Sequence, residues 1–258
     1  MIRLVAFDLD GTIADTIPMC IEAFEKAVSP YAGHTLTKEE IIQTFGLNEI
    51  GMVKAVVKER WKDALRDFYI QYEKLHSQCN TPFEGTIDLI KHLKSKGIIV
   101  ALITGKGEKS CKITLKKLNM KHMFSDIMTG SEFKNCKSES LLILMRKYNL
   151  SSEECLYIGD AVSDVIASKN VGITCLSAAW SEAADKEELY KINGKNVYES
   201  IQKLAGVFQL PLQEPIPQRQ FSFPRPTAEV DPGIFNQRRS FEQPFQGCSF
   251  FVCEPLVF

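Results

Sequence analysis

The sequence predicts an α/β fold, a Rossmann-like doubly wound parallel sheet that carries an inserted α-helical cap domain. Short, continuous apolar runs alternate with segments of helical periodicity, which is typical of parallel strands that helices cover on both faces. About 65 residues in the N-terminal third contain no convincing strand, far more than a strand-to-helix loop requires. The length of 258 residues suits one large domain or a domain with an insert.

Four apolar runs are the expected strands, and helices are expected between them. The strands are residues 4–7, 98–103, 156–158 and 173–176. A helix is expected from Gly85 to Lys96, where apolar residues form one stripe and Gly97 follows as a C-cap. Another helix begins near Lys137 and ends before Asn149. Ligands of such sheets bind at the carboxyl ends of the strands.

We expect three parts in the chain. They are a sheet domain of residues 1–15 and 82–208, a helical cap of residues 16–81 and a C-terminal tail of residues 209–258. Within the cap, Thr37 and Glu40 form a capping box that opens one helix. Residues 61–76 carry apolar side chains at helical spacing. Such a cap would lie over the carboxyl edge of the sheet.

The tail differs from the rest of the chain in composition. After Leu210 lie eight of the 11 prolines, eight of the 16 phenylalanines and no lysine. Prolines block regular helices and central strands, while the phenylalanines are too apolar for a fully solvated linker. We expect an irregular or disordered tail, and a protein partner that binds through residues 209–258 stays open.

Composition and charge exclude several other classes of protein. A formal net charge of −1 provides no basic field for nucleic acid or for an anionic membrane. Asp8 and Asp10 interrupt the N-terminus where a signal peptide would be apolar, and no apolar run approaches the ~20 residues of a membrane helix. The eight cysteines include no Cys-x-x-Cys pair, so a zinc site is not expected. We expect a cytoplasmic protein.

The segment Asp8-Leu9-Asp10-Gly11-Thr12 is the first candidate for chemistry. Asp8 and Asp10 directly follow the first expected strand, so both carboxylates lie where parallel sheets bind ligands. Gly11 permits a tight turn with close backbone approach, and Thr12 offers a hydroxyl and an amide to an oxyanion.

This segment resembles the first motif of the haloacid dehalogenase superfamily of phosphotransferases, and the other motifs follow in the family's order. Thr104-Gly105, after the second expected strand, resembles the second motif, and Lys137 resembles the lysine of the third. The segment 159–164, a Gly-Asp-x-x-x-Asp loop, resembles the fourth. The helical insert after the first motif looks like the cap of the phosphoglycolate phosphatase and β-phosphoglucomutase branch. The resemblance covers roughly residues 1–207.

The resemblance implies a role for each motif residue. Asp8 would be the nucleophile that forms an aspartyl-phosphate, and Asp10 the acid and base. The residues implied for binding the phosphoryl group are Thr12, Thr104, Gly105 and Lys137. The ligands implied for Mg²⁺ are Asp8, Asp160 and the main-chain carbonyl of Asp10, with Asp164 beside the site to orient Lys137 or a metal-bound water.

Two departures from the family pattern concern the later motifs. Ser138 follows Lys137 where the branch usually has proline, and Lys134 is a weaker candidate for the third-motif lysine. Trp180 is followed by Ser181 where relatives have glycine, and we interpret Trp180 as a packed aromatic residue.

The function implied is hydrolysis of a small phosphate monoester by a magnesium-dependent phosphatase, with 2-phosphoglycolate as the leading substrate by resemblance alone. Asp10 argues against a dehalogenase, because an acid is needed to protonate an alkoxide leaving group. A phosphomutase or pyrophosphatase of the same superfamily stays open, as does a phosphonate hydrolase that would use a cap lysine at position 54, 58 or 62. A hypothesis of another class is a partner-binding module that acts through the tail. The cap residues considered for specificity are Phe45, Gly46, Lys54, Arg60 and Arg66.

Overall fold

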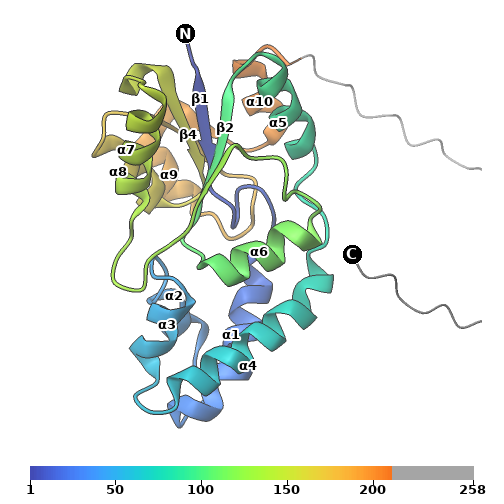
Figure 1. The fold of residues 1–258 in the computed structure, drawn as a ribbon, viewed down its shortest axis with the longest axis vertical. Helices are drawn as coiled ribbons and strands as arrows, with labels where there is room; N and C mark the ends of the chain where they lie inside the picture. Colours follow the sequence, from blue (N-terminus) through green and yellow to red (C-terminus); the bar gives the residue numbers. More distant parts are fainter. Residues whose placement is uncertain (211–258) are drawn as a thin grey trace, which may run out of the picture. The chain divides into compact units, whose positions relative to one another are not determined.

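The computed structural model describes residues 1–210, so nearly all of the predicted tail lies outside the described residues. In this part of the chain, one parallel sheet forms the centre of the fold (Figure 1). Its strands are β1 (Leu4–Phe7), β2 (Ile99–Ile103), β3 (Asp126–Met128), β4 (Cys155–Gly159), β5 (Thr174–Ala178) and β6 (Val197–Tyr198). They are ordered β3-β2-β1-β4-β5-β6. The predicted α/β class is confirmed.

β1 is the central strand and pairs with β2 on one side and β4 on the other. Leu4 lies opposite Ile99 in one pair and opposite Cys155 in the other. The strand order reverses between β1 and β4, so the ligand-binding crevice of this type of sheet is expected at the carboxyl ends of these two strands. The first residue after β1 keeps the β4 register, since the Asp8 amide donates to the Ile158 carbonyl at 2.8 Å.

Two strands were not predicted from the sequence. β3 has three residues, of which Ile127 is exposed, and β6 has only two. Such short, partly exposed edge strands lack the continuous apolar run by which the four other strands were recognised.

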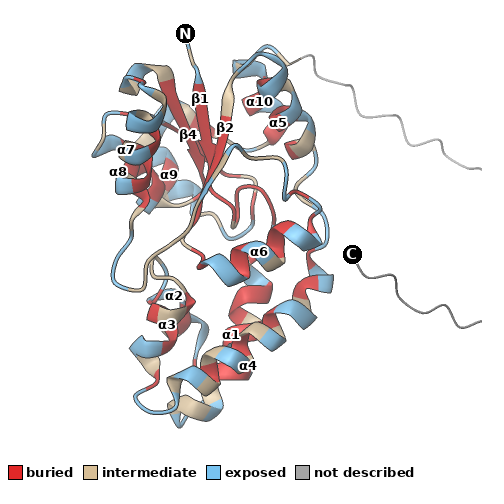
Figure 2. Ribbon diagram, viewed as in Figure 1, coloured by how far each residue is buried: buried red, intermediate tan, exposed pale blue. Residues whose placement is uncertain are grey.

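Helices cover both faces of the sheet. They are α5 (Thr86–Ser95), α6 (Glu108–Lys117), α7 (Lys137–Tyr148), α8 (Val162–Lys169), α9 (Lys186–Asn193) and α10 (Ile201–Val207), with short 3-10 helices η2 (Ser152–Glu154) and η3 (Gly194–Asn196). Alternate residues of β1 point to opposite faces: Val5 and Phe7 belong to the buried cluster that includes residues of α5, α6 and α10, whereas Leu4 and Ala6 belong to the cluster that includes residues of α7, α8 and α9. Figure 2 shows the central strands almost wholly buried between these layers.

The segment between β1 and α5 is helical and lies at the carboxyl end of the sheet (Figure 1). Its helices are α1 (Ile17–Ala32), α2 (Lys38–Ile42), α3 (Glu49–Val56), α4 (Trp61–Leu75) and the 3-10 helix η1 (His76–Gln78). α1 and α4 pack along one another, with the rings of Phe24 and Phe68 at 5.7 Å between centroids. The predicted capping box is present, because Thr37 and Glu40 exchange side-chain to backbone hydrogen bonds. The boundaries of a separate cap domain stay a prediction, and we call residues 16–81 the cap segment.

No helix within residues 1–210 is long and apolar enough to cross a membrane. The cysteines of these residues are free. The cytoplasmic location expected from the sequence stays a prediction.

Candidate active site

The loop after β1 is shaped by Gly11. Its φ of 73° lies in the left-handed region that favours glycine, and a Cβ atom built there would lie 2.1 Å from Oδ2 of Asp160. The next residue, Thr12, is buried and donates its hydroxyl to Oδ1 of Asp160 at 3.0 Å. The first and fourth sequence motifs are therefore in direct contact.

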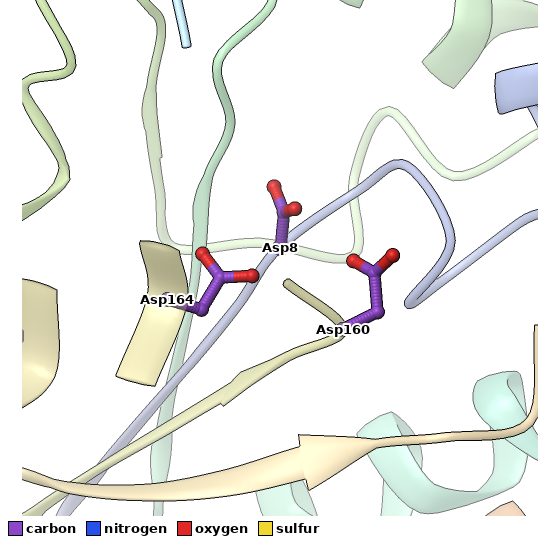
Figure 3. Close-up of side chains that lie close together, drawn as sticks. All are labelled: Asp8, Asp160 and Asp164. Carbon is purple, nitrogen blue, oxygen red and sulfur yellow. The ribbon is translucent and has the colours of Figure 1, made fainter. Parts of the chain in front are cut away.

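Three buried carboxylates converge at the carboxyl ends of β1 and β4 (Figure 3). Asp8 follows β1, Asp160 follows β4 and Asp164 lies in the first turn of α8, with one oxygen of each within 4.8 Å of the others. Oδ1 of Asp8 is buried and has no hydrogen-bond partner. Burial, together with the neighbouring charges of Asp164 and Asp10, raises the pKa of Asp8 to about 7 against the lowering effect of Lys137. Burial, followed by the charge of Asp8, also raises the pKa of Asp160 well above its ordinary value.

This cluster fits a hard divalent cation such as Mg²⁺. Carboxylate oxygens are the ligands that Mg²⁺ prefers, and the free oxygen of Asp8 provides a coordination position. A cation would also favour the ionised forms that burial opposes. Asp8 and Asp160 have oxygens open to such an ion, whereas the two oxygens of Asp164 are both engaged in hydrogen bonds.

Lys137, the first residue of α7, lies between two of these carboxylates. Its Nζ is 3.0 Å from Oδ2 of Asp8 and 2.5 Å from Oδ1 of Asp164. Burial by itself lowers the pKa of the Lys137 ammonium, but Asp164 and Asp8 together raise it above its ordinary value. Tyr157 donates its hydroxyl to the same Asp164 oxygen at 3.2 Å, and the Ala161 amide donates to the other oxygen at 3.0 Å. Asp164 thereby orients Lys137.

The alternative lysine of the third motif, Lys134, and the departure at Ser138 have clear structural positions. Lys134 is exposed and pairs with Glu139, so it does not contact the carboxylate cluster. Ser138 donates its hydroxyl to the Ala167 carbonyl at 3.1 Å and so ties α7 to α8.

Thr104 and Gly105 lie where predicted, directly after β2. Thr104 is buried, and its hydroxyl oxygen accepts from the Lys106 amide at 3.1 Å. The backbone of Gly105 touches Gly130, at which a Cβ would lie 1.9 Å from the Gly105 carbonyl oxygen. Two loops at the sheet edge therefore approach each other closely beside the cluster.

Thr12 and Trp180 make contacts that the sequence did not predict. The Thr12 hydroxyl donates to Asp160, and the phosphoryl-binding role implied for Thr12 stays a prediction. Trp180 packs against the core as predicted, and its indole Nε1 also donates to the Thr12 carbonyl at 3.0 Å. Both residues thus hold the loop that follows β1.

Sequence reasoning assigned no role to Lys106, which lies beside Asp10. Its Nζ is 3.1 Å from Oδ1 of Asp10, an oxygen that also accepts from the Thr16 hydroxyl. Two residues of the cap segment surround the ammonium, with the Tyr72 ring centroid at 4.7 Å and the Cys20 sulfur at 3.9 Å. Burial lowers the pKa of Lys106, but the charge of Asp10 raises it well above its ordinary value. The sequence could have indicated a role for Lys106 only through its position directly after Thr104-Gly105.

A cavity of about 140 Å³ lies between this cluster and the cap segment. On the core side it is lined by Asp10, Gly105, Lys106, Asn135, Lys137, Asp160, Ala161 and Ser163, and on the cap side by Ile17, Cys20, Phe45, Gly46, Leu47, Glu49 and Met52. Two of the predicted specificity residues, Phe45 and Gly46, thus line the cavity. The three basic candidates do not, because Lys54 pairs with Glu132, and Arg60 and Arg66 pair with acidic residues of α4.

The cap segment is joined to the core through Glu49 at the start of α3. This buried carboxylate accepts from the Gly107 amide at 2.8 Å and from the Ser110 hydroxyl, both at the N-terminal end of α6. Next to it, the Asn48 side chain donates to the Gly130 carbonyl at 3.1 Å. A helix N-terminus favours a carboxylate, so this contact stabilises the arrangement in which the cavity is covered.

Comparison with known proteins identifies hydrolases by both sequence and structure. Residues 5–178 match the family of haloacid dehalogenase-like hydrolases. Phosphoglycolate phosphatase 1 of Pseudomonas aeruginosa is 27% identical over 190 residues, which cover 69% of this chain and 70% of the relative. Pyrophosphatase PpaX of Bacillus pumilus is 24% identical over 192 residues, which cover 74% of this chain and 88% of the relative. Among solved structures, a hydrolase from Pseudomonas syringae has a TM-score of 0.67 at 23% identity and covers 80% of this chain and 98% of its own.

The likeness to the solved structure concerns the fold, and it extends beyond the sheet domain because 80% of this chain is matched. The family match extends from β1 to the end of β5 and so contains all four motifs. On this match, over more than half of its length, the chain belongs to the family of haloacid dehalogenase-like hydrolases.

Proposed function

We propose that this hydrolase is a Mg²⁺-dependent phosphatase that cleaves a small phosphate monoester through an aspartyl-phosphate on Asp8, with 2-phosphoglycolate as its leading substrate. The observation that carries the proposal is the environment of Asp8. One of its oxygens is 3.0 Å from the Lys137 ammonium, and the other is buried and has no hydrogen-bond partner. A carboxylate that contacts a cation, has one free oxygen and lies beside two residues of the cavity lining, Lys137 and Asp160, supports attack of Asp8 on phosphorus. The curated relatives named as a phosphoglycolate phosphatase and a pyrophosphatase support phosphoryl chemistry of this type.

The residues can carry out the transfer in two steps. In the first, an Asp8 oxygen bonds to phosphorus, the bond from phosphorus to the alcohol oxygen breaks, and Asp10 gives its proton to that oxygen. In the second, water attacks phosphorus, Asp10 takes the proton of the water, and the bond to Asp8 breaks to release inorganic phosphate. Asp10 lies two residues after Asp8 in the same turn and lines the cavity, so it can reach the leaving oxygen.

Charge neutralisation is the main task of the remaining residues. Phosphate oxygens repel an anionic nucleophile, so fixed positive charges and hydrogen-bond donors are required. Lys137 would hold the transferring group against Asp8, while Thr104 and Gly105 would offer a hydroxyl and an amide. Bound Mg²⁺, held by Asp8, Asp160 and the Asp10 carbonyl, would supply further positive charge.

A substrate panel tests the proposal. Wild type and Asp8→Asn would be assayed with Mg²⁺ and with EDTA on 2-phosphoglycolate, p-nitrophenyl phosphate and pyrophosphate. The matched control is Asp88→Asn, the same change at an exposed position of α5. We expect phosphate release by wild type and the control with Mg²⁺, and loss by EDTA or Asp8→Asn. Equal turnover by wild type and Asp8→Asn would disprove the nucleophile.

Two alternatives have their own outcomes in this assay. Hydrolysis of pyrophosphate in preference to every monoester would favour the function for which the Bacillus pumilus relative is named. Strict dependence on a sugar bisphosphate activator would indicate a phosphomutase. A partner that binds through residues 209–258 stays a prediction, because the tail lies outside the described residues.

A further inference from the structure

The charged side chains that line the cavity are distributed unevenly. The lining supplies two ammonium groups, those of Lys106 and Lys137, and both come from the core side. On the cap side the lining is mostly apolar, and its charged member is the acidic Glu49. Lys137 is engaged by Asp8 and Asp164, where the proposed function requires the transferring phosphoryl group. A second anionic group of the substrate can therefore meet only one further cation in the described lining, Lys106.

Lys106 is held in one place. Its side chain is 5% exposed, and the Tyr72 ring, the Cys20 sulfur and the Asp10 carboxylate surround the ammonium. A buried, pre-positioned ammonium loses little conformational entropy when it binds an anion. It differs in this respect from the exposed lysines of the cap segment.

The distance from Lys106 to Asp10 limits where the second anion can be. Asp10 must come within about 2.6–3.2 Å of the ester oxygen to give it a proton. The Lys106 ammonium is 3.1 Å from the same carboxylate. An anionic group two bonds from the ester oxygen therefore comes next to Lys106, whereas one at the far end of a sugar would point into the apolar cap wall.

We propose that Lys106 is the specificity-determining residue of this site and that it binds a carboxylate attached to the carbon that bears the ester oxygen, as in 2-phosphoglycolate. This inference rests on the proposed phosphatase function and deepens it. The Lys106 ammonium has three N–H donors, so it can bind the carboxylate of the substrate in addition to its contact with Asp10. The small cavity and its apolar cap wall suit a short two-carbon alcohol.

Pyrophosphate offers the same kind of feature, an anion next to the leaving oxygen. Its second phosphate carries more negative charge than one ammonium can balance, and the Glu49 carboxylate, which accepts from the Gly107 amide next to Lys106, opposes further negative charge there. The structure therefore favours the carboxylate, and the experiment includes pyrophosphate as a separate arm.

The test compares substrates of similar size in wild type, Lys106→Met and Lys116→Met, the last being a matched change at an exposed position of α6. The substrates are 2-phosphoglycolate, ethyl phosphate, which lacks the carboxylate, and pyrophosphate. We expect wild type to prefer 2-phosphoglycolate over ethyl phosphate by about 10- to 100-fold in kcat/KM, because the Lys106 ammonium would donate a hydrogen bond to the charged carboxylate. Lys106→Met should reduce this preference to within about 3-fold, and Lys116→Met should retain it.

Other outcomes would overturn the proposal. If Lys106→Met lowers kcat/KM for 2-phosphoglycolate and ethyl phosphate by the same factor, Lys106 acts through Asp10 and does not bind the carboxylate of the substrate. If pyrophosphate is the preferred substrate and its preference is lost in Lys106→Met, the anion is a phosphate. The inhibition constant of inorganic phosphate, which reports the Lys137 side of the site, should be unchanged in Lys106→Met.

A second measurement needs no variant and so does not depend on the folding of Lys106→Met. O-phosphoethanolamine has the same chain length as 2-phosphoglycolate but carries an ammonium in place of the carboxylate. Wild type should hydrolyse it more slowly than ethyl phosphate, and equal or faster hydrolysis would refute the role of Lys106. Failure here leaves the proposed phosphatase intact if ethyl phosphate is still hydrolysed in an Asp8-dependent way.

Discussion

Removal of the Asp8 charge should stabilise the metal-free protein. The unfolded chain releases the Asp8 proton near its ordinary pKa of 3.8, whereas the folded chain keeps it until about pH 7. Between these values the folded state binds more protons, so stability falls as pH rises, and the full destabilisation is present above about pH 7. Asn at this position resembles the protonated acid in shape but cannot ionise, so the variant does not lose stability as the pH rises. Lys137 keeps its partner Asp164.

The magnitude follows from the pKa values. The rise from 3.8 to about 7 at about 1.36 kcal/mol per pKa unit gives a gain in unfolding free energy of at most about 4 kcal/mol for Asp8→Asn at about pH 8. At about pH 5 the same relation gives about 2 kcal/mol. The variant should therefore be more stable than wild type, and the difference should shrink as the pH falls.

Urea unfolding followed by circular dichroism in EDTA at both pH values would measure this difference. Glu182→Gln, which removes a charge from an exposed position, serves as the control and should change stability little at either pH. Added Mg²⁺ should stabilise wild type, by about 2.7 kcal/mol at a hundredfold excess over Kd, and should stabilise Asp8→Asn less. If Asp8→Asn is as stable as wild type or less stable in EDTA at about pH 8, the explanation from buried charge is refuted.

Three further substitutions test the geometry of the site. Asp10→Asn should slow hydrolysis of alkyl phosphates by about 10²–10⁴-fold but that of p-nitrophenyl phosphate much less, because its leaving group needs no proton; steady-state kinetics with equal losses would contradict an acid role. Gly11→Ala should weaken Mg²⁺ binding measured by calorimetry, because its Cβ would lie 2.1 Å from the Asp160 carboxylate, and an unchanged affinity would show that the loop yields. Trp180→Phe should lower the free energy of unfolding by about 1 kcal/mol through loss of the hydrogen bond to the Thr12 carbonyl, measured in urea, and unchanged stability would mean that this bond contributes nothing.

The central part of the fold could be predicted because its signals are local. Four strands were recognised as continuous apolar runs, and Gly97 and Asn149, at the ends of their helices, take the positive φ typical of C-caps. β3 and β6 were not predicted. A short edge strand forms mainly through backbone pairing with its neighbour, and its own side chains give little signal.

For the candidate site as well, one part could be predicted from the sequence and another could not. The resemblance of the sequence motifs to those of the family implied that one site contains Asp8, Asp10, Thr104, Lys137 and Asp160. The topology of a parallel sheet gives a physical reason, because it collects the carboxyl ends of its strands at one edge. The motifs and their order in the sequence carried that conclusion.

Only the tertiary structure decided how the side chains pair. It turned the Thr12 hydroxyl toward Asp160, placed Lys106 beside Asp10 under the cap segment, and joined Glu49 to the start of α6. The partners in these contacts are far apart in the sequence, and each pairing depends on burial and on the competition of several charges for one hydrogen-bond position. A linear pattern carries no record of such competition, so the sequence determined which groups meet at the sheet edge, and packing against the cap segment determined which of them bind one another.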